Sequence, residues 1–380
     1  MQNLLYLQMN QIQPSKIKLL IGINAFDMTG APRLIVDEIN NLDRTKYQLV
    51  LLTFFEVGAE NNFFDLLPDE VTSYKLNFKN FYDIKNWFKL CKILKEYKPN
   101  MVLSHLFFSN TVLRILKPFF KYKIVIYEHN TYTKKTRLQV LIDRILSRLT
   151  YKIIAVSGTV KQFTANQEKI NSEKFVVLSD SINYHHIQSK IEGCDKDELK
   201  QKLGFKKEDK LIINAAKFNW QKNHQLLIDS FAEFSKQNSD YKLIILGNGV
   251  LWDFFNQYIK KIKMEDRIFL LGRQKNILDY MFISEFFLLT SKIEGFCIAC
   301  IEAMAIGLPV VSTNVAGPDE YIVNGFNGYL VKSDNKEEIV AAMQKVADQG
   351  RNSFSDNCRQ TAQNYDVKEH IKGLEAIIRQ

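Results

Sequence analysis

The sequence predicts two α/β domains in tandem, each built on a parallel β-sheet that helices cover. Short, continuous runs of Val, Ile and Leu alternate with amphipathic helical stretches almost from end to end. Because these runs do not alternate polar with apolar residues, their strands are expected to be buried on both faces, as in parallel sheets. The chain also has 380 residues, more than one ordinary core holds, so two domains are the default expectation.

The first domain is expected to span residues 16–183. Amphipathic patterns at 31–42 and 81–97 predict helices between its strands. Residues 1–15 have a brief apolar run but no basic start and no small-residue cleavage site, so they are interpreted as a loose leader and not as a signal peptide. The predicted strands of this domain are 18–24, 48–54, 101–105, 123–129, 152–157 and 175–179.

The second domain is expected to span residues 184–365. The stretch 183–210 is polar and highly charged and lacks a good apolar strand, so the interdomain linker is placed at its start. Residues 366–380 are assigned to a closing helix. The alternation of strands and helices resumes after the linker, with predicted strands at 211–216, 242–247, 267–272, 286–291 and 308–313.

Composition and charge limit the classes of partner. Apolar residues make up 46% and charged residues 24%, as in soluble globular proteins, and no window approaches the roughly 20 apolar residues that span a bilayer. Five cysteines, an odd number, indicate a reducing cytoplasm. The net charge is +9, and residues 101–150 hold nine Lys or Arg against two acids. This block is either a solvated surface or a docking surface for lipid head groups, a lipid-linked phosphate or nucleic acid.

The stretch EGFCIACIEA (294–303) carries the most specific chemical signal. A helix is expected to begin near Cys297 and to end at Gly307, a good C-terminal capping residue. The N–H groups of its first turn would form a seat for an anion. Glu294 precedes this helix and Glu302 lies within it, so the two carboxylates act as separate acceptors for hydroxyl groups. If one carboxylate binds a sugar, the other binds a ribose and a phosphate lies between them, the ligand is a nucleotide sugar.

Polar residues and glycines also follow the other strands of the second domain. In open parallel sheets, ligands bind beyond the carboxyl ends of the strands, so these residues are expected to line the same ligand. A structural turn is the alternative for each cluster taken alone. The residues concerned are Lys217 and Lys222, Gly247, Gly272 and Arg273, and Gly317 and Glu320.

Residues 294–331, EGFCIACIEAMAIGLPVVSTNVAGPDEYIVNGFNGYLV, resemble the signature of the retaining glycosyltransferases of group 1 (glycosyltransferase family 4 type). The resemblance implies the GT-B fold, in which two Rossmann-like domains face each other across a cleft and a closing helix crosses back to the first domain. It implies that Glu294 binds the donor sugar, Glu302 the ribose and Lys222 the diphosphate. Lys217 stands where the family more often has arginine. The other donor-binding positions that it implies are Gly30, Gly295, Phe296, Cys297 and Ile298, whereas Gly247, Gly272 and Arg273 are expected to bind the donor because they follow strand ends.

The resemblance is weaker in the first domain but extends to several positions there. Gly30 matches a glycine-rich loop after the first strand, although Thr29 replaces the first of two usual glycines. His129 matches an active-site histidine and His105 a second family position. With Glu294 and Lys222, His129 is the implied catalytic set. The implied acceptor side consists of His105, His129, Lys134, Lys135 and Arg137.

Two further motifs have competing interpretations. Cys297 and Cys300 have C-x-x-C spacing, but no second pair completes a zinc site. A redox pair is one alternative, because a helix N-terminus lowers the pKa of a thiol; small side chains that let the helix approach a phosphate are the favoured explanation. Asp195 and Asp197 have the D-x-D shape of metal-dependent glycosyltransferases, but they lie in a charged linker and are interpreted as surface.

These observations predict a glycosyltransferase that moves a hexose from a nucleoside-diphosphate sugar, with a UDP-sugar favoured, to a glycan or lipid-linked acceptor. The resemblance implies retention and a role in cell-surface polysaccharide or lipopolysaccharide synthesis. Neither a metal nor another cofactor is expected, and nucleic acid is not an expected partner. The expected location is the cytoplasm, peripheral on the inner face of the membrane. The alternatives are a nucleotide-sugar epimerase of the same fold and a non-catalytic sugar-nucleotide-binding protein.

Overall fold

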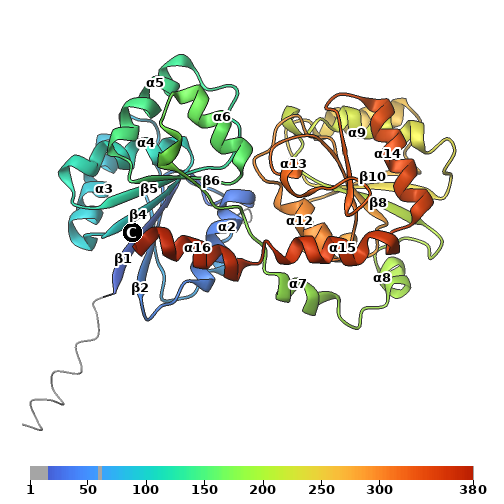
Figure 1. Cartoon of the computed structure of the whole chain (residues 1–380), viewed down its shortest axis with the longest axis horizontal. Helices are drawn as coiled ribbons and strands as arrows, with labels where there is room; N and C mark the ends of the chain where they lie inside the picture. Colours follow the sequence, from blue (N-terminus) through green and yellow to red (C-terminus); the bar gives the residue numbers. More distant parts are fainter. Residues whose placement is uncertain (1–15, 59–61, 380) are drawn as a thin grey trace, which may run out of the picture. The chain divides into compact units, whose positions relative to one another are not determined.

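The computed structural model describes residues 16–58 and 62–379, so the predicted leader 1–15 lies outside the described residues. The chain contains two β-sheets with helices around them (Figure 1). It divides into two compact units. The first unit is Met1–Tyr127, Thr136–Ile154 and Glu375–Gln380, and the second is Glu128–Lys135 and Ala155–Leu374. The last residues of the closing helix therefore group with the first unit.

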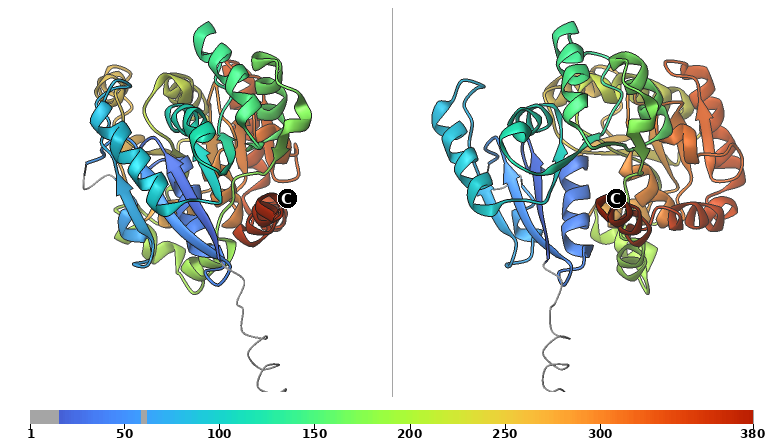
Figure 2. Two further views of the ribbon diagram at one scale, coloured as in Figure 1. Left: turned by 90° about the vertical axis from the view of Figure 1, so that its left-hand side faces the viewer. Right: turned by 60° about the vertical axis from the view of Figure 1, so that its left-hand side comes forward.

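The first sheet has the strand order β3-β2-β1-β4-β5-β6-β7. The pairs from β3 to β5 are parallel. Figure 2 shows the helix α3 on one side of the first strands and α2 on the other. The strands are β1 Ile17–Ile23, β2 Tyr47–Thr53, β3 Thr72–Lys75, β4 Met101–His105, β5 Lys123–Glu128, β6 Lys152–Ala155 and β7 Phe175–Val177, and the α-helices are α2 Gly30–Asn41, α3 Ile84–Tyr97, α4 Phe107–Leu116, α5 Arg137–Leu146 and α6 Gly158–Glu168.

The second sheet has the order β10-β9-β8-β11-β12-β13, and every neighbouring pair is parallel. Its strands are β8 Lys210–Ala215, β9 Tyr241–Leu246, β10 Ile268–Gly272, β11 Phe286–Leu289, β12 Val310–Thr313 and β13 Gly328–Val331. The helices after β7 are α7 Tyr184–Ile191, α8 Lys196–Lys202, α9 His224–Phe234, α10 Trp252–Lys261, α11 Ile277–Phe282, α12 Ile298–Ala305, α13 Pro318–Tyr321, α14 Lys336–Gln349, α15 Asn352–Gln363 and α16 Val367–Arg379.

The predicted α/β architecture is confirmed, and each of the eleven predicted strands has its counterpart within a few residues. Two strands were not predicted, β3 and β13, and both lie at the edge of a sheet. The charged stretch 183–210 contains two helices, α7 and α8, where a polar linker was expected to begin. Asp195 caps α8 and accepts hydrogen bonds from the N–H groups of Asp197 and Glu198, so the D-x-D motif is a helix N-cap.

The central strands are buried on both faces, as their continuous apolar runs predict. Successive residues of β1 and of β8 are fully buried, including Leu19, Leu20 and Ile21 in the first sheet and Leu211 and Ile212 in the second. Because successive side chains of a strand point to opposite faces, burial of consecutive residues requires cover on both sides.

One buried ion pair fixes the rotation of α5 in the first unit. Arg114 of α4 is hydrogen-bonded to Asp143 of α5, and both side chains are almost fully removed from solvent. Leu138, Leu141 and Ile145 are spaced three and four residues apart on the helix and are exposed. At 100° per residue they lie on the side of α5 opposite Asp143. The ion pair therefore holds an apolar stripe, Leu138, Leu141 and Ile145, toward solvent.

We expect Asp143→Ala to lower the free energy of unfolding by about 3 to 5 kcal/mol, because it leaves the buried guanidinium of Arg114 without its carboxylate. The matched control is Glu96→Ala, which breaks the exposed ion pair with Lys92 and should cost less than about 1 kcal/mol. Urea denaturation followed by circular dichroism measures both. Equal costs for the two variants would contradict the structural role of the buried pair.

Candidate functional site

The strand order of the second sheet defines where its site lies. The chain runs from the central β8 outward through β9 to β10, and then returns to β11 on the other side of β8. The order of strands therefore reverses between β8 and β11, and ligands of open α/β sheets bind beyond the carboxyl ends of the strands at such a point. Because all the pairs are parallel, the residues predicted after β8, β9, β10, β11 and β12 follow strand ends on this one edge.

Lys222 and Glu294 form an ion pair across this reversal point. Lys222 follows β8 and Glu294 follows β11, and the Nζ of the lysine lies 2.5 Å from an Oε atom of the glutamate. The hydroxyl of Ser291 donates a hydrogen bond of 2.7 Å to the same oxygen. The carboxylate is thus held by two donors from neighbouring loops before any ligand is present.

The loop after β8 is folded by its own side chains. The amide oxygen of Asn219 accepts hydrogen bonds from the N–H groups of Gln221 and Lys222, which forms a short turn at Trp220–Lys222. Asn223 then adopts the left-handed conformation (φ 50°), which asparagine tolerates better than most residues. The helix α9 begins directly afterwards, so Lys222 stands at a fixed point between strand and helix.

Hydroxyl groups at the ends of the strands join the two loops. Thr290 donates a hydrogen bond to the carbonyl oxygens of Lys222 and Asn223, and the N–H of Lys292 donates one to the carbonyl of Gln221. Thr313, at the end of β12, donates a 2.6 Å bond to the carbonyl of Ser291. The backbone around the ion pair is therefore cross-linked in three places.

Burial and charge act in opposite directions on Lys222. Burial is the largest single effect and lowers the pKa of its ammonium group, but Glu294, together with Cys297 and Cys300, outweighs burial and the pKa is raised. The side chain of Glu294 is 7% exposed and that of Lys222 is 23% exposed. A lysine that is charged, partly exposed and fixed at the reversal point can bind an anionic ligand such as a diphosphate.

The loop from Glu294 to Cys297 is packed against backbone on two sides. A Cβ atom on Gly295 would lie 1.9 Å from the carbonyl oxygen of His129, and one on Gly317 would lie 2.4 Å from the backbone of Phe296. The buried ring of Phe296 contacts the rings of Tyr321 and Tyr365. Both glycines are thus required by close approach of backbone segments within the second unit.

The helix α12 begins at Ile298, next to Cys297 as predicted. Cys297 is its N-cap and has a left-handed backbone (φ 64°, ψ 74°), which is unusual for a residue with a side chain. The hydroxyl of Tyr321 donates hydrogen bonds to the carbonyls of Phe296 and Cys297. These bonds hold the start of α12, whose first N–H groups have no partner within the helix and can receive an anion.

The other predicted donor-binding residues of the second domain also follow strand ends, but the role of one of them differs from expectation. Lys217 and Arg273 are exposed, and Glu302 is half-buried within α12. Gly272 has a left-handed φ of 70° and open space around it. Gly247 was expected to let the backbone approach a ligand, but a Cβ there would lie 2.0 Å from the carbonyl oxygen of Ala216. The backbone at Gly247 therefore packs against the loop after β8.

The two predicted histidines differ in their surroundings. His129 follows β5 and is half-buried, and burial lowers its pKa to about 3, so its imidazole is neutral at ordinary pH. His105 is fully buried, and its ring stacks on that of Tyr127 with centroids 4.1 Å apart. The expected contact of His105 with an acceptor does not fit this geometry, because the residue is shielded from solvent at the end of β4.

The predicted basic residues of the acceptor side are also not equivalent. The side chain of Lys135 is only 7% exposed and forms ion pairs with Glu168 (2.5 Å) and Glu128 (3.5 Å), so its ammonium group is already held by two carboxylates. The ammonium group of Lys134 lies 3.7 Å from the centre of the Trp220 ring. Arg137 is exposed at the start of α5. Gly30 is the exposed first residue of α2, preceded by Thr29, whose hydroxyl bonds to Asp27.

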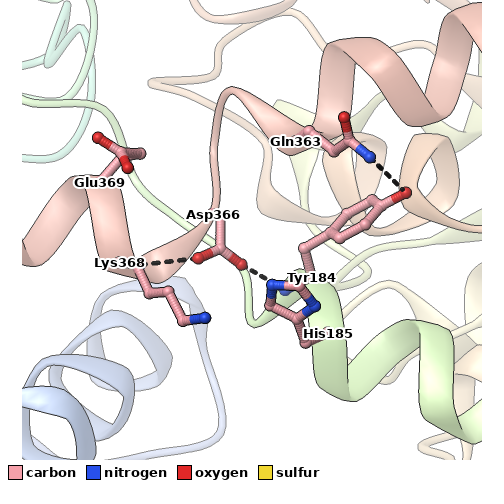
Figure 3. Close-up of a pocket in the computed structure, with 6 residues that line it drawn as sticks. All are labelled: Tyr184, His185, Gln363, Asp366, Lys368 and Glu369. Carbon is pink, nitrogen blue, oxygen red and sulfur yellow. Dashed lines mark hydrogen bonds between the residues drawn. The ribbon is translucent and has the colours of Figure 1, made fainter.

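A shallow pocket in the second unit contains none of the predicted site residues (Figure 3). Asp366 lies at its centre and accepts hydrogen bonds from the N–H groups of Tyr184 and Lys368, while Gln363 donates to the hydroxyl of Tyr184. These bonds connect the start of α7 to the start of α16. The hydrogen bonds of Asp366, Tyr184 and Gln363 thus hold these two parts of the chain together.

Sequence reasoning missed three hydroxyl residues that build the site, Thr290, Ser291 and Thr313. Their signal was present: each stands at or just after the carboxyl end of a predicted strand, in LLTS and VVST. A missed histidine, His224, is buried against the ring of Phe218, and burial lowers its pKa to about 3.

Across residues 16–58 and 62–379, no three His, Cys, Asp or Glu side chains gather as they would around a metal ion. None of the helices there is long and apolar enough to cross a bilayer.

Two family models match consecutive parts of the chain. Residues 28–185 match the model described as Glycosyltransferase Family 4, and residues 195–365 match Glycosyl transferases group 1. Together they cover most of both units and include each predicted catalytic residue.

Curated relatives share this family. The chain is 23% identical over 349 residues to the UDP-Gal:alpha-D-GlcNAc-diphosphoundecaprenol alpha-1,3-galactosyltransferase of Escherichia coli, over 87% of this chain and 88% of that one. It is 34% identical over 136 residues to the N-acetyl-alpha-D-glucosaminyl L-malate synthase of Bacillus anthracis, where the match spans 36% of this chain and only 35% of the relative.

Solved structures agree on the fold. The Anabaena HepE structure in complex with UDP-glucose superposes with a TM-score of 0.83 at 19% identity, covering 96% of this chain and 99% of that one. WaaG, described as a glycosyltransferase involved in lipopolysaccharide biosynthesis, superposes with a TM-score of 0.74 at 15% identity, covering 95% and 99%. With two parallel sheets of the same architecture and consecutive matches to both family models, the chain belongs to the GT-B glycosyltransferases of group 1.

Proposed function

We propose that this glycosyltransferase moves a hexose from a UDP-sugar to a lipid-linked or polysaccharide acceptor, with retention of configuration. The observation that carries the proposal is the Lys222–Glu294 ion pair at the reversal point of the second sheet, beside the start of α12. This arrangement offers a cation, a helix N-terminus and a buried carboxylate at one edge. Those are the groups that a diphosphate and the hydroxyls of a sugar require.

In the proposed mechanism, the second unit binds the donor and stabilises the leaving group. Lys222 and the first N–H groups of α12 face the diphosphate, whose negative charge grows as the bond to the sugar breaks. Glu294 accepts hydrogen bonds from the sugar hydroxyls. The acceptor hydroxyl attacks from the side that the diphosphate leaves, and the departing phosphate takes its proton. The protein groups supply the positive charge, so no divalent metal is needed.

Binding of the donor must rearrange the ion pair. While Lys222 is bonded to Glu294, the two charges neutralise each other in a partly buried setting. A diphosphate competes for the lysine, and the sugar hydroxyls replace the lysine on the carboxylate. A ligand with only one of these groups leaves one charge unpaired, which costs free energy. The pair thus favours the intact nucleotide sugar over either half of it.

His129 is proposed to contact the reacting sugar. Its carbonyl lies against Gly295 of the donor loop within the second unit, and its neutral ring can donate or accept a hydrogen bond with a hydroxyl group. The low pKa makes it a poor general base at neutral pH, so its proposed role is to position the sugar.

The relatives support the choice of donor and acceptor classes. The name of the Escherichia coli relative gives a UDP-hexose donor and a diphosphoundecaprenol-linked acceptor. The HepE structure contains UDP-glucose, and another relative is a lipopolysaccharide core biosynthesis mannosyltransferase from Rhizobium meliloti. An enzyme that uses a lipid-linked acceptor must work at a membrane surface.

The first test is a thermal-shift series with UDP-glucose, UDP-galactose, UDP-N-acetylglucosamine, GDP-mannose and ADP-glucose, each with and without EDTA. A ligand at about 100 times its Kd adds about 2.7 kcal/mol of stability. We expect stabilisation by a UDP-hexose that EDTA does not change. Stabilisation only by a GDP- or ADP-sugar would contradict the proposed donor, and its loss in EDTA would contradict metal independence. Epimerisation of the donor without any acceptor would favour the epimerase alternative.

A second test removes the lysine of the ion pair. We expect Lys222→Met to weaken binding of the stabilising UDP-hexose about ten- to hundredfold, because a charged hydrogen bond to the diphosphate is worth about 1.5 to 3 kcal/mol. Titration calorimetry measures the affinity, and circular dichroism checks the fold. The control is Lys236→Met, which breaks an exposed pair with Glu233 in the same unit. Equal affinities for the two variants would rule out Lys222 as a diphosphate ligand.

The apolar stripe of α5 is proposed to contact an anionic membrane surface. Leu138, Leu141 and Ile145 are 65%, 47% and 56% exposed, and Arg137 and Arg148 are exposed nearby in the sequence. Leucines flanked by arginines on one helix fit the boundary between lipid head groups and acyl chains. This stripe replaces the buried Lys135 as the proposed membrane contact of the basic block.

We expect the double variant Leu138→Ser, Leu141→Ser to bind vesicles of phosphatidylcholine and phosphatidylglycerol at least about tenfold more weakly, because up to about 1.5 to 3 kcal/mol is gained when one leucine leaves water. Vesicle sedimentation measures binding, and pure phosphatidylcholine vesicles report the contribution of charge. The control is Phe254→Ser, an exposed aromatic residue of α10 in the second unit. Unchanged binding of the double variant would exclude α5 as the contact.

A further inference from the structure

Cys297 and Cys300 at the start of α12 were explained as small side chains that let the helix approach a phosphate. Their sulfur atoms also contact each other, which that explanation does not require. The sulfur atoms of Cys297 and Cys300 lie 3.1 Å apart, and both cysteines are free thiols. The sulfurs of two other cysteines hydrogen-bond to backbone carbonyls instead, Cys194 to Lys190 and Cys358 to Asn327. The contact between two sulfurs is thus specific to the turn that follows Glu294.

We propose that Cys297 and Cys300 form a reversible disulfide that weakens binding of the donor. The sulfurs need to approach by about 1 Å to reach the bond length of about 2.05 Å. Cys297 is the N-cap and Cys300 lies in the first turn of α12, so a small local adjustment brings the sulfurs together. Formation of the disulfide is independent of the proposed function, whereas its effect on donor binding rests on that function.

The two thiols have different surroundings, which assigns them different roles. Cys297 is half-buried at the N-cap of α12. Cys300 is fully buried, and burial together with its contact to Cys297 raises the pKa of its thiol. Cys300 therefore keeps its proton and can donate it toward the sulfur of Cys297. Cys297 is the thiol that a soluble oxidant reaches first.

The proposed oxidant is hydrogen peroxide. The thiolate of Cys297 attacks one peroxide oxygen, the O–O bond breaks, and hydroxide leaves as Cys297 becomes a sulfenic acid. The sulfur of Cys300 then attacks that of Cys297 and displaces the sulfenic oxygen as water. In sum, two thiols and one peroxide give one disulfide and two waters. A dithiol reductant reverses the reaction by two thiol–disulfide exchanges.

The disulfide acts on the donor loop through short connections. The carbonyls of Phe296 and Cys297 are bonded to Tyr321, and Gly295 has no room beside His129. A shift of Cys297 toward Cys300 therefore displaces a turn that has little freedom to adjust. Glu294, three residues before Cys297, is the carboxylate proposed to hold the donor sugar.

The experiment compares the unmodified chain with Cys300→Ala and with Cys194→Ala, which removes an exposed cysteine outside the site. Each protein is treated with hydrogen peroxide, and thiols are counted by maleimide labelling and intact mass. We expect the unmodified chain and Cys194→Ala to lose the two thiols at 297 and 300, as peptide mapping would show, and to recover them in dithiothreitol. Cys300→Ala should form no such bond. Persistence of both thiols, or oxidation of Cys297 that dithiothreitol does not reverse, would overturn the proposal.

The effect on the donor is measured separately, by titration of the UDP-hexose before and after oxidation. We expect about tenfold weaker binding in the oxidised chain, within the usual range for coupling between sites, and no change for oxidised Cys300→Ala. Equal affinity of the reduced and disulfide forms would overturn the regulatory part. If no reduced protein binds a UDP-hexose, the proposed donor is wrong, but the mass measurement still decides whether the disulfide forms.

Discussion

The ion pair between Lys222 and Glu294 is the interaction on which the arrangement of the second unit's site depends. It joins residues 72 apart in the sequence because β8 and β11 are neighbours in the sheet. Thr290, Ser291 and Thr313 hold the two loops in place around it. A charge pair whose side chains are only 23% and 7% exposed and are held by fixed donors is less screened by water than a pair on the surface.

Three glycines allow the loops at this edge of the second sheet to pack closely against other backbone segments. At Gly247, Gly295 and Gly317 the backbone meets another backbone segment at distances that no Cβ allows. Each of these close approaches joins loops that follow different strands or lie far apart in the chain, so the loops support one another. Of these glycines, Gly247 was expected from its place after a strand to let the backbone approach a ligand. In this chain the three glycines bring backbone segments together and so fix the loops that follow the strands.

Much of the fold could be predicted because strong local patterns determine it. Buried strands such as β1 and β8 are continuous apolar runs, whereas the edge strands β3 and β13 (TSYK and GYLV) are short and carry polar or small residues. The edge of the sheet on which the site lies could be predicted from the parallel arrangement of the strands. The pairing of Lys222 with Glu294 could not be predicted, because it depends on the order of the strands in the sheet. Nor could sequence distinguish Lys134 from Lys135, since adjacent lysines differ only in which one the fold buries.

The division of the chain into units has a consequence for how such enzymes can be recombined. Both units are discontinuous, and the chain passes between them at 127/128, 135/136, 154/155 and 374/375. A single cut near residue 183 would therefore leave the second unit without Glu128–Lys135, the segment that holds His129 against Gly295. A chimera that keeps the second unit whole must carry this short segment along with the second sheet. The second unit thus depends on a segment, Glu128–Lys135, that lies in the first half of the sequence.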